Sequence, residues 1–316
     1  MKKLISRKPR VSVPKISVKK FKNLFTYKRA ISTVLVLSLA LFAVSGATYW
    51  YRNVLTDPDK ILSDMVDKSL QAGSVYRTVD QQSGQSSVKQ DVFVKFSPEV
   101  LSESVTNLQE FNDLGRTRVT TESIGTAQTD LIRYTAISIE GNPNTKRNFD
   151  NILNAWGRRD VNEQTGESTS FLNDALFVIV PFGNLNPSQR AEMQETIKKA
   201  NLYNYSDYKI EKVDGRRVVT YAIDLDPQAL VTVLAKYVEL TGVGQGAELN
   251  PASYEGAEKI RVNLTVDLLS RHVQSIDFAD SGRKETYGSY NVTRDITLPK
   301  ETIDINELQT RLQTIQ

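Results

Sequence analysis

The hydrophobic positions of this chain form one long uninterrupted run and many short alternating ones. The long run covers residues 30–51 and reads AISTVLVLSLALFAVSGATYWY, with no charged side chain between Arg29 and Arg52. As a helix it would extend about 33 Å, since each residue adds ~1.5 Å, and this is enough to cross the hydrocarbon core of a bilayer. The run therefore predicts one N-terminal transmembrane helix.

The charges around this run predict its orientation. Residues 1–29 hold eleven Lys and Arg side chains, whereas Arg52 stands alone just beyond the run. Positively charged flanks stay in the cytoplasm, and Trp and Tyr residues, such as those that end the run, collect at membrane interfaces. We therefore expect a basic cytoplasmic tail over 1–29, an anchor over 30–51 and an extracytoplasmic domain over 52–316. The expected location is the cytoplasmic (inner) membrane of a bacterium, with the N-terminus inside.

A cleavable signal peptide is the alternative interpretation of the same segment. Ser45, Gly46 and Ala47 supply small residues in the pattern of a cleavage site after Ala47. The basic region ahead of the run is longer than that of a usual signal, and the run exceeds the typical apolar core of about 7–15 residues. These features favour the uncleaved anchor, and both interpretations export the remainder of the chain.

Short alternating runs in the rest of the chain predict a sheet. Ile260, Val262 and Leu264 alternate strictly with polar neighbours, as expected for an antiparallel strand with one buried and one solvated face. Similar segments are separated by turn signals such as Ser83-Gly84. We predict about ten antiparallel strands, of which the clearest cover 75–82, 87–97, 100–109, 115–125, 129–139, 260–268, 271–279 and 284–298.

The segment 207–225 predicts a β-hairpin with a defined register. Asp214 and Gly215 fit a two-residue turn of type I′. This turn places Tyr208 opposite Tyr221, and the register agrees with the hydrophobic pattern of both strands.

Apolar residues at helical spacing predict several amphipathic helices between the strands. Asp57-Pro58 and Asp226-Pro227 each combine a capping side chain with a proline suited to the first helical position. Gly73 lies where the first of these helices should stop. The predicted amphipathic helices cover 58–72, 146–157, 227–238 and 304–315, and Asn186-Pro187 predicts the start of a polar helix that continues to about Ala200.

The most apolar stretch outside the anchor is 171–183, FLNDALFVIVPFG, which is too short to span a bilayer. We expect it to form a lid or portal over an apolar cavity. The alternative is that its side chains simply pack the core. The candidate cavity-lining residues are Trp156, Phe171, Leu176, Phe177, Val180 and Phe182.

Net charge divides the chain into two parts. The total of 40 Lys and Arg against 37 Asp and Glu gives +3, but residues 1–56 hold 12 basic side chains and no acidic one. The rest therefore holds 28 basic and 37 acidic side chains, a net of −9, which argues against a uniformly basic nucleic-acid binder. We expect the tail to contact anionic lipid headgroups, at ~1 kcal/mol per charge near the surface, and no nucleic acid.

Residue counts also limit the chemistry. The absence of cysteine excludes disulfides, thiolate metal sites, a cysteine nucleophile and lipidation at a cysteine. A single histidine, His272, argues against most catalytic triads and histidine metal sites. We therefore expect neither an enzyme nor a bound metal or cofactor.

The order of these elements resembles that of the LolA-like superfamily, which includes the lipoprotein carrier LolA and LprG- and LppX-type lipid-binding domains. The resemblance lies in the first helix, DPDKILSDMVDKSLQAG, in the hairpin and helix YKIEKVDGRRVVTYAIDLDPQALVTVLAKY, and in the closing strands VNLTVDLLSRHVQSIDFADSGRKETYGSYNVTRDITLP, within residues 57–300. It implies an α+β fold in which a curled antiparallel sheet forms a half-barrel, with amphipathic helices covering its concave side around an apolar cavity.

The resemblance implies a non-catalytic, membrane-anchored protein that binds a lipid, a lipoprotein or another apolar ligand. This chain lacks the lipidated cysteine of the lipoprotein members and carries a membrane segment instead, so it would be tethered rather than free to shuttle. The alternative is an envelope interaction or sensor module without a ligand cavity, with the basic tail as its cytoplasmic output. An apolar pocket of ~300–1,000 Å³ favours ligand binding, and a filled core favours the alternative.

Overall fold

The computed structural model divides the chain into two compact units, Met1–Leu55 and Thr56–Gln316. In the first unit, residues 38–46 and 48–49 are α-helical. None of the described helices is both long enough and apolar enough to cross a membrane. The predicted tail and residues 30–37, 47 and 50 of the predicted anchor lie outside the described residues. The structure describes residues 38–46, 48–49, 51, 55–112, 115–141, 148–160, 170–244 and 249–314.

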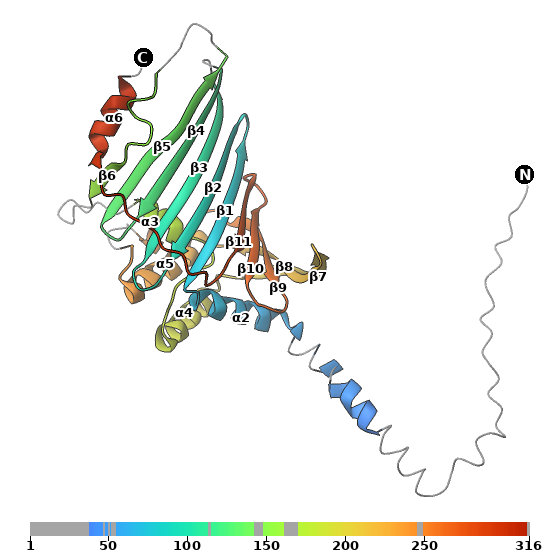
Figure 1. Ribbon diagram of the computed structural model, residues 1–316. Helices are drawn as coiled ribbons and strands as arrows, with labels where there is room; N and C mark the ends of the chain where they lie inside the picture. Colours follow the sequence, from blue (N-terminus) through green and yellow to red (C-terminus); the bar gives the residue numbers. More distant parts are fainter. Residues whose placement is uncertain are drawn as a thin grey trace, which may run out of the picture. The chain divides into compact units, whose positions relative to one another are not determined.

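The second unit is built on one curled sheet of twelve strands (Figure 1), in the order β12-β6-β5-β4-β3-β2-β1-β11-β10-β9-β8-β7. Neighbouring strands pair antiparallel, except that β12 pairs parallel with β6. The strands are β1 (Ser74–Ser83), β2 (Ser86–Lys95), β3 (Leu101–Asn112), β4 (Gly115–Gly125), β5 (Thr129–Glu140), β6 (Gly157–Asp160), β7 (Tyr205–Val213), β8 (Arg216–Leu225), β9 (Ile260–Asp267), β10 (Val273–Phe278), β11 (Arg283–Gly288) and β12 (Ile303–Asp304).

Helices gather at one end of the sheet, and β2 to β5 extend beyond them (Figure 1). The helices of this unit are α2 (Pro58–Leu70), α3 (Ser170–Leu176), α4 (Pro187–Lys199), α5 (Pro227–Thr241) and α6 (Ile305–Gln313), with a short 3₁₀ helix, η3 (Pro251–Tyr254). The predicted caps are confirmed, because the side chains of Asp57 and Asp226 accept hydrogen bonds from first-turn amides, and Pro occupies the first position of both helices.

The core lies between the sheet and these helices. Ile61, Met65 and Leu70 of α2 are buried on one side of the helix, as their spacing predicts. The buried Tyr221 of β8 donates a hydrogen bond of 2.8 Å to the Pro58 carbonyl and fixes the start of α2 on the sheet. The 207–225 hairpin has the predicted register, with Tyr208 opposite Tyr221.

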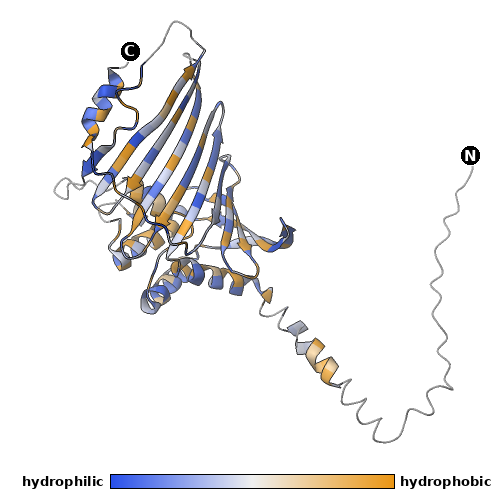
Figure 2. Ribbon diagram, in the orientation of Figure 1, coloured by the Kyte–Doolittle hydropathy of each residue, from blue (hydrophilic) through white to orange (hydrophobic). Residues whose placement is uncertain are grey.

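The sheet is larger than predicted and is not purely antiparallel. It has twelve strands rather than about ten, because β6 and β12 are too short to give an alternating pattern. Figure 2 shows that hydrophobic and hydrophilic positions alternate along the long strands, and this alternation is what made those strands predictable.

The helix predicted over 146–157 is wrong for its described part, 148–156, which contains turns and an isolated bridge between Leu153 and Tyr134. Asn154 has φ 64°, a left-handed conformation that a helix does not accommodate, and its amide donates to the Tyr134 carbonyl at 2.8 Å. The segment therefore runs beside β5 before it enters β6.

The strand predicted over 284–298 is wrong in its second half, where the chain leaves the sheet after β11. Ser289 and Asn291 have φ values of 48° and 59°, which break an extended strand. Arg294 then pairs with Glu103 of β3. The segment thus crosses a face of the sheet on its way to β12 (Figure 1).

Candidate functional site

Polar contacts of α3 identify the face of the sheet on which this short helix lies. The Ser102 hydroxyl of β3 donates to the Phe171 carbonyl at 3.4 Å, and Asp130 of β5 accepts from the amides of Ser170 and Phe171 at 2.9 and 3.2 Å. We call the face that carries Ser102 and Asp130 the inner face, and the opposite one the outer face. Because side chains alternate along a strand, the strand register assigns every residue of β2 to β5 to one of these faces.

The register also arranges the inner face in cross-strand rows of directly paired residues. In the row beneath α3, Ser102 pairs with Gly125, and Gly125 pairs with Asp130. The next row, toward the far end of the strands, contains Ser104 and Ser123, whose hydroxyls lie 2.7 Å apart. These rows consist largely of small side chains, and we call them the small-residue rows. They contain Val94, Ser102, Gly125 and Asp130 in the first row, and Val92, Ser104, Ser123 and Ile132 in the second.

The small side chains let the backbone of α3 approach the sheet closely. A Cβ atom at Gly125 would lie 2.5 Å from the Leu172 amide nitrogen and 3.0 Å from its Cα atom. Leu172 is fully buried, and Leu176 is 3% exposed. Glycine is therefore required at position 125 for α3 to lie where it does.

Charged side chains of the sheet hold both ends of α3. The carboxylate of Asp130, which is 1% exposed, accepts from the Ser170 amide and hydroxyl and from the Phe171 amide, and it also pairs with Arg159. At the other end, Arg77 of β1 donates to the Asp174 carbonyl at 3.1 Å. A carboxylate at the start and a guanidinium at the end complement the helix dipole.

Arg77 belongs to a buried polar network beneath α3. Its guanidinium lies 3.8 Å from the carboxylate of Glu285, which also accepts from Arg283 and from the Tyr287 hydroxyl. Burial, followed by the charge of Glu285, raises the pKa of Tyr287 above its ordinary value. Tyr287 therefore remains a neutral hydrogen-bond donor to Glu285.

The far part of the inner face has a different character. Val88 pairs with Leu108, Leu108 with Val119, and Val119 with Ile137. All four side chains are half-buried, and the register places them three rows away from the row beneath α3, toward the far end of β2 to β5. We call these four residues the apolar row. Contiguous apolar side chains that stay accessible to solvent mark binding sites more often than isolated ones do.

A polar row separates the apolar row from the small-residue rows. It contains Gln90, Thr106 and Thr121, and a register shift in β5 places Tyr134 opposite Thr121. Burial raises the pKa of Tyr134, so its hydroxyl is neutral at physiological pH. The inner face thus offers an apolar strip with uncharged hydrogen-bonding groups on the side toward α3 and Glu110 on the other side.

The residues predicted to line a cavity are placed in two regions. Leu176, Val180 and Phe182 are buried, and the ring of Phe182 stacks on that of Tyr287 at a centroid distance of 5.3 Å. Phe171 and Phe177 are half-buried in the same segment. Trp156 is half-buried elsewhere, with the Arg133 guanidinium 4.7 Å from its ring centroid. The role of these six residues in ligand contact stays a prediction.

Two hollows lie outside the inner face. A groove of about 960 Å³ lies between α2 and α4, with an apolar floor that includes Leu62 and Ile197 and a rim that includes Asp59, Glu195 and Lys198. A second hollow of about 700 Å³ lies between β6, β12 and α6 and is lined largely by polar residues. The charged rim makes the first groove a poorer site for a purely apolar ligand than the apolar row. Within the described ranges, no three His, Asp or Glu side chains converge as a metal site requires.

Sequence reasoning missed the apolar row. Each of its members is a single apolar residue between polar neighbours, which predicts the face on which it lies but not its cross-strand partners. The two-residue turn after Ser83, which pairs Ser83 with Ser86, could have provided the register of the first strand pair. The later registers could then have been aligned on the hydrophobic pattern.

Comparison with known proteins gives distant similarity to solved structures. No family model and no curated protein matches the chain. Among solved structures, LprF from Mycobacterium bovis is similar over 77% of this chain and 98% of that chain, with 13% sequence identity and a TM-score of 0.39. The description of this chain as an α+β protein with a curled, open sheet rests on its own strand order.

Proposed function

We propose that the second unit is a LolA-like, extracytoplasmic, non-catalytic domain that binds a lipid or another apolar ligand on its inner face. The observation that carries the proposal is the apolar row, Val88, Leu108, Val119 and Ile137, whose half-buried side chains are direct cross-strand neighbours. Neighbouring strands lie ~4.8 Å apart, so the row extends roughly 14 Å across the sheet. This length suits an acyl chain better than a small solute.

Burial of apolar area would stabilise the complex. Each Å² of apolar surface removed from water contributes about 25 cal/mol, and a bound chain would cover both itself and the row. The neighbouring hydroxyls of Thr106, Thr121 and Tyr134 could hydrogen-bond a polar headgroup without burying a charge. The groups between the apolar row and α3 are uncharged, which favours binding over acid–base catalysis, and we therefore propose a non-catalytic role.

Native mass spectrometry tests the ligand proposal. Thr56–Gln316 forms a compact unit, so a chain beginning at Thr56 can be purified, measured for co-purified mass, extracted with organic solvent and titrated with palmitic acid. Ile137→Asp places a charge in the apolar row and is expected to weaken binding at least tenfold.

Ser138→Asp is the matched control, because Ser138 is the exposed neighbour of Ile137 on the outer face and is expected to leave binding unchanged. The proposal is contradicted if the wild-type domain carries no co-purified apolar molecule and also takes up no palmitic acid. Equal losses in the two variants would move the site away from the inner face.

We further propose that residues 30–51 remain attached as the anchor, with the tail inside and the domain outside the cytoplasmic membrane. The uninterrupted apolar run and the eleven positive charges before it support this topology. The intact mass of the chain extracted from membranes measures attachment directly. A full-length mass is expected, and a mass that begins after Ala47 would show cleavage instead.

A further inference from the structure

The turn between β9 and β10 displays the most exposed large hydrophobic side chain described in the second unit. Leu269 is 77% exposed, whereas the next in that unit, Leu298, is 47% exposed. An exposed leucine contributes little to folding, because its apolar surface remains in water. Leu269 is therefore available for a contact outside the fold.

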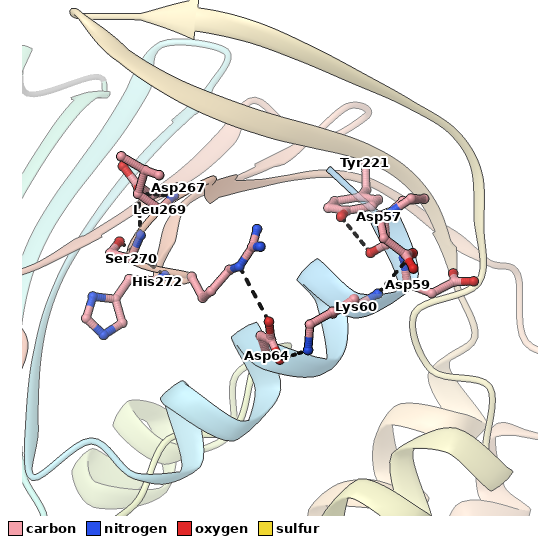
Figure 3. A network of polar contacts seen from close by, with 11 residues as sticks. Asp57, Asp59, Lys60, Asp64, Tyr221, Asp267, Leu269, Ser270 and His272 are labelled. Carbon is pink, nitrogen blue, oxygen red and sulfur yellow. Dashed lines mark hydrogen bonds and ion pairs between the residues drawn. The ribbon is translucent and has the colours of Figure 1, made fainter. Parts of the chain in front are cut away.

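The turn that carries Leu269 is held firmly in place. Asp267 Oδ1 accepts from the amides of Leu269 and Ser270 at 2.9 and 2.8 Å, as Figure 3 shows. The next residue, Arg271, is buried, and its guanidinium pairs with Asp64 of α2 at 3.5 Å. Leu269 therefore lies in a turn that is held by side-chain hydrogen bonds and an ion pair.

The tip of the β7–β8 hairpin lies directly beside this turn and is basic. The Leu268 amide donates to the Arg217 carbonyl at 2.9 Å, which joins the two turns. Residues 209–217 hold four Lys or Arg side chains and two acidic ones, a net of +2 in a domain whose net charge is −9. Val213 at this tip is 44% exposed.

A further positive charge lies on α2 close to the same turn. Burial, and then the charge of Lys68, lowers the pKa of His272 below its ordinary value, so His272 is neutral at physiological pH. The ring of His272 stacks on that of Tyr290 at a centroid distance of 4.1 Å. Each of the two turns therefore presents an apolar side chain with basic side chains nearby, and the acidic side chains of the hairpin segment are Glu211 and Asp214.

We propose that Leu269, Val213 and the basic side chains Lys212 and Arg216 form a docking surface for an anionic phospholipid membrane. Leucine and valine would enter the headgroup region while the cations contact lipid phosphates, a combination that drives interfacial binding. A protein partner is the other occupant of such a surface, but the local excess of positive charge in an acidic domain favours anionic lipid.

Chain length is compatible with this occupant. If the proposed anchor ends at Tyr51, residues 52–56 extend at most roughly 17 Å. From Pro58 to Asp64, which holds the turn, α2 adds about 9 Å. The docking surface can therefore reach the membrane in which the chain is anchored.

Vesicle co-sedimentation of the domain that begins at Thr56 tests this proposal. The wild-type domain is expected to bind vesicles containing phosphatidylglycerol, to bind pure phosphatidylcholine vesicles much more weakly, and to dissociate as salt concentration rises. Leu269→Glu is expected to lower binding about tenfold, because it removes an inserted leucine and adds a negative charge. Arg216→Glu is expected to lower it several-fold on anionic vesicles only.

Matched variants distinguish docking from general surface effects and from ligand binding. Leu298→Glu and Lys300→Glu alter an exposed leucine and an exposed lysine at another place and are expected to leave vesicle binding unchanged. Ile137→Asp in the apolar row is also expected to leave it unchanged. Absence of wild-type binding to anionic vesicles, or equal losses for Leu269→Glu and Leu298→Glu, would overturn the proposal while leaving the ligand proposal intact.

Discussion

The two halves of the inner face are made by the same strands and yet have opposite characters. Near the helices, α3 packs against Ser102, Gly125 and Asp130, and its two leucines, Leu172 and Leu176, are buried. Farther along β2 to β5, Val88, Leu108, Val119 and Ile137 are half-buried. The far half therefore carries a full row of apolar side chains that none of the described helices buries, whereas the half beneath α3 mixes valine and isoleucine with small and charged residues.

Side-chain size and charge explain this difference. A helix backbone can approach a sheet closely only where the sheet presents glycine and serine, and its unpaired terminal amides need an acceptor such as Asp130. The row of Val88, Leu108, Val119 and Ile137 contains no glycine or serine and no carboxylate acceptor, and it presents apolar side chains instead. The half near the helices therefore suits permanent packing against α3, and the far half suits a ligand that can bind and leave.

The largest loss of unfolding free energy is expected for a substitution of Leu172, the buried leucine of α3. Leu172→Ala should lower the free energy of unfolding by about 3 kcal/mol, because Leu172 is fully buried and its truncation leaves a cavity. Urea unfolding of the second unit measures the change. A loss below about 1 kcal/mol would show that α3 does not pack against the sheet as part of the core.

The second-largest loss of unfolding free energy is expected when the carboxylate that holds the start of α3 is removed. Asp130→Ala is expected to cost about 2 kcal/mol, since two amides, one hydroxyl and Arg159 lose a charged acceptor. Hydrogen exchange should show faster opening of α3 in this variant. Asp160→Ala, which changes a 60% exposed side chain of β6, is the control and should cost less than about 1 kcal/mol.

A side chain added at Gly125, where α3 lies closest to the sheet, should lower the free energy of unfolding by a smaller amount. Gly125→Ala is expected to cost about 1–2 kcal/mol, because the new methyl group meets the backbone of Leu172 and must displace α3. Gly288→Ala meets no atom within 4 Å and should be nearly neutral. Equal stability of the two variants would mean that α3 does not lie against Gly125.

The smallest effect on stability is expected in the apolar row. Leu108→Ala should cost less than about 1 kcal/mol, because the side chain is only half-buried and its loss leaves an open surface rather than a cavity. The same unfolding measurement applies, with Leu172→Ala as the buried reference. A loss as large as that of Leu172→Ala would indicate that the row is part of the core.

Local patterns predicted much of this fold. The β7–β8 hairpin and the helix starts at Asp57 and Asp226 follow from turn and cap chemistry that lies within a few residues. The parallel pairing of β12 with β6 joins residues about 145 positions apart, and neither strand is long enough to show a pattern. Such a contact depends on the whole fold and could not be predicted locally.

The candidate site was predictable only in part. Alternation along each strand assigns Leu108 or Val119 to a face, but exposure depends on where α3 lies, and this depends on Gly125 and Asp130. The strong hydrophobicity of residues 171–183 instead predicted a lid or portal in the segment that contains α3. Phe182, for example, is buried in that segment and contacts Tyr287, so its apolar character already serves the core.

Photo-crosslinking with a diazirine-bearing fatty acid tests the central proposal most directly. The probe is bound to the second unit, activated by light, and its adducts are mapped by mass spectrometry, with palmitic acid as competitor. Adducts are predicted on the inner-face residues of β2 to β5, at or beside Val88, Leu108, Val119 and Ile137, and competitor should reduce them. Adducts confined to the groove between α2 and α4 or to the outer face, or labelling that palmitic acid does not reduce, would contradict it.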